Sequence, residues 1–291
     1  MKKSRSIKST VFARMMDMGG FPVRQAIPAA GMEQIDPFLL LHHADITVPA
    51  HIPVSKSGVG PHPHRGFSPV TFIYKGGVQH RDSRGNNNIV YEGGIQWMNA
   101  GMGIVHSERP PQNIAEMGGR QELIQLWVNT PARYKMEQPR YYPLTREEIP
   151  VIQTPDGRVS IQIVSGELEG IKGKIPLFSP VNTYSIALKK NGTYFIAVPA
   201  THNGFVYLLD GSVRIGEPGT EVAGKNLVNF NQDGEGILLT ATEETRLLLG
   251  TGEPLEEPVA SHGPFVMNNE TELLQAFRDY QLGKMGVLIE D

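Results

Sequence analysis

The sequence predicts an all-β chain made of two barrels, and three observations support this fold class. Glycine and proline supply 32 and 22 of the 291 residues, above their average usage of about 7% and about 5%. Turn-formers at this level favour many short strands joined by tight turns. Short apolar runs broken by Gly, Pro and Asn follow one another along the chain, as in a sandwich or barrel. An internal repeat with an offset of 135 residues indicates that the barrel is duplicated.

The first half of the chain contains the clearest strand signals. Residues 70–74 form a strand candidate that ends at the turn Gly76-Gly77, and the strand pattern resumes over residues 78–80. The Gly-Asn-Asn-Asn run within residues 84–88 is expected to be a loop tip. Further strands are expected at residues 89–91, 94–98 and 123–128.

Residues 130–150 have a different character. They contain four prolines and mixed charges, and apolar periodicity lapses. This composition predicts an interdomain linker. The expected organisation is an N-terminal metal-binding barrel over residues 1–134, a linker over residues 135–150 and a C-terminal barrel over residues 151–291.

Strand patterning returns at residues 159–164, and the repeat follows it. Residues 71–78 resemble residues 206–213, because the apolar strand, the turn glycine and the following valine all align. A repeat of this length suggests a duplicated barrel more than a short-repeat solenoid.

The chain is expected to close with a helix. Asn269 is a suitable N-cap, and Glu272 stands three residues later as the partner of a capping box. Gly283 is expected to end the helix. One apolar stripe, suited to packing, consists of Leu273, Ala276, Phe277 and Tyr280.

Composition excludes several classes of function. The chain contains no cysteine, so disulfides, thiolate nucleophiles and iron–sulfur clusters are excluded, and any metal must take nitrogen or oxygen ligands. The net charge of −3 and the pI of about 6.3 argue against direct nucleic-acid binding. No apolar run has the length of a signal peptide or of a membrane span. A cytoplasmic protein without membrane contact is therefore expected.

Two short motifs predict a metal site. His62-Pro63-His64 and His106-Ser107-Glu108 each place two metal-binding side chains at positions i and i+2. In a β-strand such side chains project from the same face. Two neighbouring strands would therefore bring three imidazoles and one carboxylate together, a set that suits a divalent first-row metal and leaves coordination positions open.

The second copy of the repeat lacks these ligands. Shifting His62 and His64 by 135 residues reaches Ala197 and Pro199, and residues 226–250 contain no histidine. The sequence therefore predicts one barrel that binds metal and one that does not.

The longer motifs around these residues resemble the pirin family. They are Gly60–Phe67 (GPHPHRGF), His80–Ser83 (HRDS) and Gln96–Glu108 (QWMNAGMGIVHSE). The resemblance extends over almost the whole chain through Asp36–Phe38, Gln125–Asn129, Gly252–Leu255 and Gly263–Asn268.

The resemblance implies a fold and a cofactor. Pirins are bicupins, with two jelly-roll barrels in one chain, and the N-terminal barrel binds iron. Carried over by position, the metal ligands are His62, His64, His106 and Glu108. One divalent transition metal per chain is expected, with Fe(II) as the first candidate. Mn, Co, Ni, Cu and Zn remain open, because affinity for such ligands varies across the series and occupancy depends on supply.

The resemblance also implies two alternative functions. The first is quercetin 2,3-dioxygenase activity, in which a flavonol and O2 react with opening of the heterocyclic ring and release of carbon monoxide. Glu108 would then act as general base on the 3-hydroxyl group. The alternative is a non-enzymatic, redox-responsive iron protein that regulates a protein partner.

Some residues near the motifs depart from the family pattern or have other expected roles. Most cupins, pirins included, have a glutamate where this chain has Ser68, so an outer carboxylate that would orient a ligand is expected to be missing. The adjacent His42 and His43 stand where pirins commonly carry an acidic residue, and, with His51, are expected to be loop or packing residues. His80 and Asp82 are expected to shape a hairpin. Met98 and Phe67 are candidates for the wall of a small-molecule pocket, whereas Trp97, Met102 and Val105 are expected to fill the core.

Overall fold

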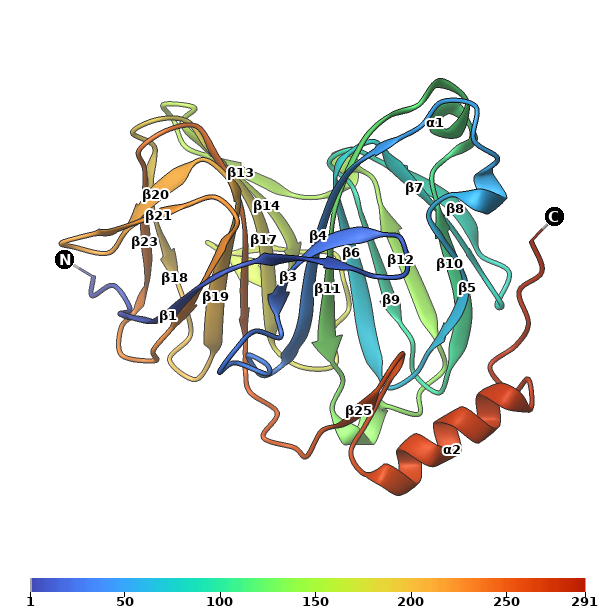
Figure 1. The fold of residues 1–291 in the computed structure, drawn as a ribbon. Helices are drawn as coiled ribbons and strands as arrows, with labels where there is room; N and C mark the ends of the chain where they lie inside the picture. The colour runs from blue at the N-terminus through green and yellow to red at the C-terminus, as the bar shows by residue number, and fades with distance from the viewer. Residues whose placement is uncertain (1, 291) are drawn as a thin grey trace. The chain divides into compact units, whose positions relative to one another are not determined.

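The computed structural model describes residues 2–290, and strands dominate them (Figure 1). These residues divide into two compact units. We call one the His-rich unit, which comprises Met16–Val23, Leu39–Glu148 and Glu256–Asp291. The other is the apolar unit, which comprises Met1–Met15, Arg24–Phe38 and Ile149–Leu255. The His-rich unit contains eight of the nine histidines, all except His202.

The chain passes between the two units several times. The sequence-based division instead gave each barrel one continuous stretch, residues 1–134 and residues 151–291. In the structure, β1 (Ile7–Phe12) pairs with β22 (Asn226–Phe230) inside the apolar unit. The residues after Leu255 belong to the His-rich unit. Local patterns report where strands occur but not which sheet they join, so this exchange of segments was not visible in the sequence.

The His-rich unit contains a four-stranded sheet that carries the predicted metal motifs. Within the described residues its order is β5 (Val59–His64), β10 (Ile104–Arg109), β7 (Gly77–Asp82) and β8 (Asn87–Tyr91). A larger sheet contains β12 (Arg140–Leu144), β9 (Ile95–Asn99), β6 (Phe67–Lys75), β11 (Gly119–Asn129) and β4 (Phe38–Val48) in that order. Two short strands, β2 (Arg14–Asp17) and β3 (Pro22–Ile27), cross the boundaries between the units along the chain.

The strands predicted in the first half of the chain are confirmed as parts of β6, β7, β8, β9 and β11, apart from Gly94, which precedes β9. The predicted loop tip is shorter than expected, because β8 already begins at Asn87. The predicted turn joins β6 to β7, and Gly76 adopts φ 79° there. An added Cβ at Gly76 would lie 3.0 Å from the carbonyl oxygen of Arg120. This position therefore requires glycine for both conformation and space.

The segment expected to be a linker contains a strand. β12 pairs with β9, and Tyr141 lies opposite Met98. Pro143 is accommodated because β12 is the edge strand of its sheet, where a missing backbone N–H removes no ladder bond to a further strand. The prolines thus indicate an edge strand here and not a break in the fold.

The C-terminal segment adds β25 (Ala260–His262), β26 (Phe265–Met267) and α2 (Glu270–Gln281) to the His-rich unit; Figure 1 shows α2 and β25 in red. The predicted N-cap is confirmed, since the Asn269 side chain accepts a hydrogen bond from the Glu272 amide at 3.0 Å. Glu272 in turn accepts from the amide of Asn268 at 3.0 Å, one residue before the cap. Gly283, with φ 72°, follows the end of the helix as expected.

Buried polar contacts connect this C-terminal segment to the strands around the metal motifs. Arg65 Nη1 lies 3.0 Å from the Asp279 carboxylate of α2. The buried Lys135 ammonium donates to the carbonyl oxygens of Gly66, at 2.6 Å, and Val266, at 3.1 Å. These bonds satisfy charges that would otherwise be costly to bury.

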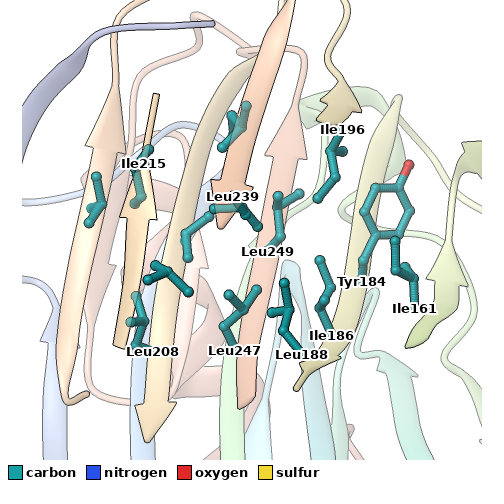
Figure 2. Packing of buried hydrophobic residues seen from close by; sticks show 14 of the residues in the cluster. Ile161, Tyr184, Ile186, Leu188, Ile196, Leu208, Ile215, Leu239, Leu247 and Leu249 are labelled. Carbon is teal, nitrogen blue, oxygen red and sulfur yellow. The ribbon is translucent and has the colours of Figure 1, made fainter. Parts of the chain in front are cut away.

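The apolar unit has the same arrangement of two sheets. Among the described residues one sheet runs β1, β22, β19 (Asn203–Asp210), β24 (Thr245–Gly252), β17 (Val181–Leu188), β14 (Val159–Ser165) and β13 (Val151–Gln153). The other runs β18 (Thr193–Ala197), β23 (Gly236–Ala241), β20 (Ser212–Ile215) and β21 (Thr220–Ala223). Branched aliphatic side chains such as Leu208, Leu247 and Leu249 pack together between the strands (Figure 2).

The strand register gives the equivalence between the two units. Val78 and Val213 align in the repeat, so His80 corresponds to Ile215, two residues later in each strand. Glu108 lies opposite His80, and Leu239 lies opposite Ile215.

The same register locates the counterparts of the histidine motifs. His106 pairs with His62, and two residues before Leu239 the residue Ile237 pairs with Ile196. The counterparts of His62 and His64 are therefore Ile196 and Val198. The fixed offset of 135 residues pointed to Ala197 and Pro199, one residue away, because the connections between the strands differ in length.

The remaining elements are short. They are η1 (Val54–Lys56), α1 (Gln112–Met117), η2 (Ala132–Tyr134), η3 (Arg146–Glu148), β15 (Glu167–Leu168) and β16 (Ile171–Lys172). Within residues 2–290, no helix combines the length and the apolar character that crossing a membrane requires.

Candidate metal centre

Three histidines of the His-rich unit meet as predicted. His62 and His64 project from the same face of β5, and His106 lies opposite His62 on β10. Their ring centroids are 4.3 Å apart for His62 and His106, 4.8 Å for His62 and His64, and 5.0 Å for His64 and His106. One ligand nitrogen from each residue lies within 4.8 Å of the other two. Adjacent antiparallel strands thus convert two i, i+2 motifs into one site.

One nitrogen of each ring is already engaged. His62 Nδ1 lies 2.8 Å from the carbonyl oxygen of Gly60, and His64 Nδ1 lies 3.2 Å from that of Pro264. A carbonyl oxygen only accepts, so both Nδ1 atoms carry the proton and leave the Nε2 lone pair free. His106 Nδ1 lies 3.3 Å from His80 Nδ1.

The other nitrogens fit a metal ion. Nε2 of His64 and Nε2 of His106 are buried without a hydrogen-bond partner in the described part of the chain. An unsatisfied buried nitrogen is costly, and a metal ion would supply the missing partner. This donor set suits Zn, Cu, Fe or Ni by its chemistry.

The electrostatic setting of His64 and His106 favours their neutral forms. Burial, together with the nearby charge of His62, holds the pKa of His64 well below its usual value. Burial and the same neighbour, with His64 and His80, act in the same direction on the pKa of His106. Neutral imidazole is the form that binds metals, so these two histidines are in the form that metal binding requires.

Glu108 lies beside the triad, on the same face of β10 as His106. Its carboxylate accepts hydrogen bonds from Thr71 Oγ1 at 2.7 Å and from Gln125 Nε2 at 2.9 Å. Trp127 Nε1 donates to Gln125 Oε1 at 3.2 Å and so fixes the orientation of that amide. The residues that the structure brings within metal-binding distance of one another are the three histidines, without Glu108.

Aromatic side chains line one side of His64. The Phe67 ring centroid lies 5.1 Å from the His64 ring centroid, and the Trp127 centroid lies 5.5 Å from it. Phe67 and Trp127 also contact each other at 4.2 Å. Met98 instead packs with Ala100 and Ile104.

His80 and Asp82 do more than close a hairpin. Asp82 does accept from the amides of Arg84 and Asn86 in the β7–β8 turn, at 2.9 Å and 3.1 Å. In addition, His80 Nε2 lies 2.9 Å from Asp82 Oδ2, and both side chains are buried. The contact of His80 with His106 was missed in the sequence, although His80 and Asp82 have the same i, i+2 spacing as the ligand motifs.

The outer-carboxylate hypothesis at Ser68 does not fit the structure. Ser68 is buried, and its hydroxyl donates to Asn99 Oδ1 at 2.7 Å. Thr71, which contacts Glu108, is three residues further along the uninterrupted strand pairing and therefore lies on the opposite face of β6. A glutamate at position 68 would start from the face that does not carry Thr71.

The other clustered histidines lie apart from the triad. His42 and His43 are buried in β4, and not in a loop. His43 Nε2 lies 3.4 Å from the buried Glu122 carboxylate, and burial lowers the pKa of His42 to about 4. His51 is exposed in a turn, with φ 60°. Over residues 2–290 the triad is the one group of His, Asp or Glu side chains close enough together to hold a metal ion.

Family models and known proteins of one kind match this chain over most of its length. The family model Pirin matches residues 20–128, and the model for the pirin C-terminal cupin domain matches residues 183–286. A pirin-like protein of Solanum lycopersicum is 35% identical over 98% of this chain and 94% of its own length. A Pseudomonas aeruginosa protein named "putative quercetin 2,3-dioxygenase" is 36% identical over 91% of this chain and 92% of its own.

A solved structure agrees with these sequence matches. The crystal structure of a quercetin 2,3-dioxygenase from Acinetobacter baumannii superimposes with a TM-score of 0.91 at 34% identity. The match covers 98% of this chain and 100% of that chain.

Proposed function

The chain belongs to the pirin family, with two cupin domains, and on this premise we propose that it is a metal-dependent dioxygenase of the quercetin 2,3-dioxygenase type. The observation that carries the proposal is the histidine triad with its unpartnered nitrogens, which lies within the residues that match the Pirin model. Relatives at 34–36% identity that bear the name quercetin 2,3-dioxygenase support the choice of reaction.

We propose one divalent transition metal per chain, with Fe(II) first and Mn, Co, Ni, Cu and Zn as alternatives. His62, His64 and His106 would hold it through Nε2, and Glu108 would be the fourth ligand. When bound, iron supplies a Lewis acid that acidifies a coordinated hydroxyl group and a redox centre for the reaction with O2.

In this proposal Glu108 is also the general base. It would accept the proton of the flavonol 3-hydroxyl group at a carboxylate oxygen. Thr71 and Gln125 each donate one hydrogen bond to the carboxylate, and each oxygen has more than one acceptor direction. Glu108 can therefore take the proton while these two donors keep it in place.

The aromatic side chains would orient the substrate. A flavonol is planar and largely apolar, and the partly exposed Trp127 offers a ring surface beside His64. Phe67 is fully buried and packs against both rings. Apolar walls with a few polar groups are typical of small-molecule sites. These rings would also exclude water from the reacting atoms.

Turnover of quercetin tests the reaction. Protein is loaded with Fe(II) in the absence of oxygen, mixed with quercetin and exposed to air. The flavonol absorbance should then decrease and carbon monoxide should be released, whereas metal-free protein should give neither change. Full metal occupancy without turnover would contradict the dioxygenase proposal and would favour a redox-sensing protein that regulates a protein partner.

Glu108→Gln tests the base. Glutamine keeps the size and one coordinating oxygen but removes the charge and the basicity, so we expect turnover to fall roughly 10²–10⁴-fold, with weaker metal retention. Elemental analysis of the assayed sample must show full metal content, so that loss of the base is separated from loss of metal. Undiminished activity in the loaded variant would mean that the base lies elsewhere.

A further inference from the structure

A fourth buried histidine contacts the triad from outside. His80 Nδ1 lies 3.3 Å from His106 Nδ1, and His80 Nε2 lies 2.9 Å from Asp82 Oδ2. His80 is 1% exposed and Asp82 4% exposed. Both nitrogens of His80 are therefore engaged, one by a ligand and one by a carboxylate.

Asp82, His80 and His106 are connected by two hydrogen bonds. Only one placement of the protons along them leaves His106 able to bind metal through Nε2. An ionised carboxylate only accepts, so His80 Nε2 carries the proton toward Asp82. His80 Nδ1 then accepts, His106 Nδ1 donates to it, and the lone pair of His106 is on Nε2. The opposite tautomer of His80 would lose the bond to Asp82 and would require His106 to carry its proton on Nε2, where the metal must bind.

Asp82 is held in the form that this arrangement needs. Its Oδ1 accepts from the amides of Arg84 and Asn86, and its Oδ2 accepts from Asn86 Nδ2 at 2.7 Å as well as from His80. Burial alone would raise the pKa of Asp82, but the hydrogen bonds from His80, Asn86 and Arg84 outweigh it and hold the pKa below its usual value. The carboxylate therefore stays ionised and acts as an acceptor.

The ring of His80 is also fixed in orientation. Tyr141 of β12 stacks on it, with the ring centroids 3.9 Å apart and an angle of 8° between the planes. His80 belongs to the small sheet and Tyr141 to the large one, so the two sheets together hold the imidazole plane. The Tyr141 hydroxyl has no hydrogen-bond partner over residues 2–290, so the contact to His80 comes from the ring.

In the apolar unit, the positions that correspond to His80 and His106 are both occupied by apolar residues. His80 and His106 correspond to Ile215 and Ile237, which both belong to the apolar core. The outer histidine is thus absent where the ligand is absent.

We propose that His80 and Asp82 are positioning residues of the metal centre, which hold His106 in the tautomer and orientation that metal binding requires. Ligating histidines commonly donate their second N–H directly to a carboxylate or carbonyl group. In this chain an imidazole stands between the ligand and the carboxylate. The inference concerns metal binding alone, so it can fail or hold independently of the proposed dioxygenase reaction.

Metal release is the measurement that tests it. Each variant is loaded with Co(II), its visible absorption spectrum is recorded, and release to an excess of chelator is followed in time. For His80→Phe, which keeps a ring against Tyr141 but removes both nitrogens, we expect roughly 10–100-fold faster release and a changed Co(II) spectrum. His80→Gln keeps one donor and one acceptor and should restore part of the retention.

Matched variants separate this role from the shaping of the hairpin. Asn86→Ala removes a bond from Asp82 Oδ2 in the turn but leaves the His80 contact, whereas Asp82→Asn weakens the acceptor for His80. We expect Asp82→Asn to accelerate release and Asn86→Ala to release Co(II) at nearly the wild-type rate. Tyr141→Phe, which keeps the stacked ring, should also behave like wild type.

Two results would overturn the proposal. One is wild-type release and an unchanged spectrum in His80→Phe. The other is equal acceleration in Asn86→Ala and Asp82→Asn, which would assign the effect to the hairpin. If His80→Phe does not fold, the pair at positions 82 and 86 still decides the question.

Discussion

The two units have the same arrangement of strands but carry different kinds of side chain at the corresponding inner positions. In the His-rich unit the inner positions of β5 and β10 hold three histidines and Glu108. The corresponding positions in β18, just after it and in β23 hold the branched aliphatic residues Ile196, Val198, Ile237 and Leu239. A neighbouring row differs in the same way. Gln125, Thr71 and Gln96 lie side by side across three strands of the His-rich unit, and their counterparts are Leu249, Val206 and Val228.

This difference shows that a polar site takes positions where buried apolar side chains could stabilise the unit. Ile196, Leu239 and Leu249 (Figure 2) belong with Ile237 to one continuous apolar core. Each such side chain contributes about 1.5–3 kcal/mol when fully buried. At the corresponding positions the His-rich unit has imidazoles, amides and a carboxylate, which need hydrogen-bond partners. Its buried apolar side chains, such as Val70, Ile124 and Leu126, lie at other positions of the sheets. We therefore expect stability and metal binding to respond to different units.

The largest effect should come from the ligands. The double variant His62→Ala, His64→Ala should lose nearly all of the one metal equivalent that we expect per wild-type chain, measured by elemental analysis after reconstitution. The matched double variant Ile196→Ala, Val198→Ala changes the corresponding positions of the apolar unit and should keep the full equivalent. Two tightly bound equivalents in wild type, or metal retained without His62 and His64, would remove the distinction between the units.

A single core substitution should have the converse effect. Ile237→Ala lies at the counterpart of His106 and leaves a cavity among fully buried side chains, so we expect it to lower the free energy of unfolding by about 2–5 kcal/mol. Urea denaturation of the metal-free protein measures this, with metal stoichiometry as the control. A loss below about 1 kcal/mol would show that this core is loosely packed.

Lowering the pH should destabilise the His-rich unit more than the apolar unit, with a smaller effect than the substitutions above. Burial lowers the pKa of His42 in the His-rich unit from 6.5 to about 4. Between these values the unfolded chain binds a proton at His42 that the folded chain does not. The contribution of neutral His42 to the free energy of unfolding is therefore fully present above pH 6.5 and is lost as the pH falls toward 4. For His42 alone this amounts to about 3 kcal/mol. The apolar unit contains one histidine, His202, and should lose less.

Hydrogen exchange followed by mass spectrometry can resolve this difference. Metal-free protein is compared at pH 7 and pH 4.5, with rates corrected for the intrinsic dependence of exchange on pH. His42→Gln, which cannot titrate in this range, should reduce the acid effect on the His-rich unit. Equal loss of protection in both units, unchanged in His42→Gln, would contradict the assignment.

The placement of His62 and His64 side by side could be predicted from the sequence because its geometry is local. The alternation of a strand places His62 and His64 on one face, whatever the rest of the chain does. Asn269 and Glu272 at the start of the helix were predictable for the same reason. In each case the residues that interact are at most a few positions apart.

The contacts that complete the site were not predictable in this way. His80 reaches His106 across a strand pair, and Tyr141 reaches His80 from the segment expected to be a linker. The carbonyl group that bonds to His64 comes from Pro264, 200 positions later. No periodicity in the sequence reports such pairings, because they depend on which sheet each strand joins.

The bond between His64 and Pro264 has a consequence for synthesis of the chain. A ribosome makes the three histidines early, but the carbonyl that fixes the tautomer of His64 is added only after the whole apolar unit. Asp279 and Glu290, which pair with Arg65 and Arg109 beside the ligands, are added later still. A nascent chain therefore carries the metal-binding residues without the segment that holds them in place. We therefore expect the centre to reach its final form only after the segment that follows the apolar unit has been made.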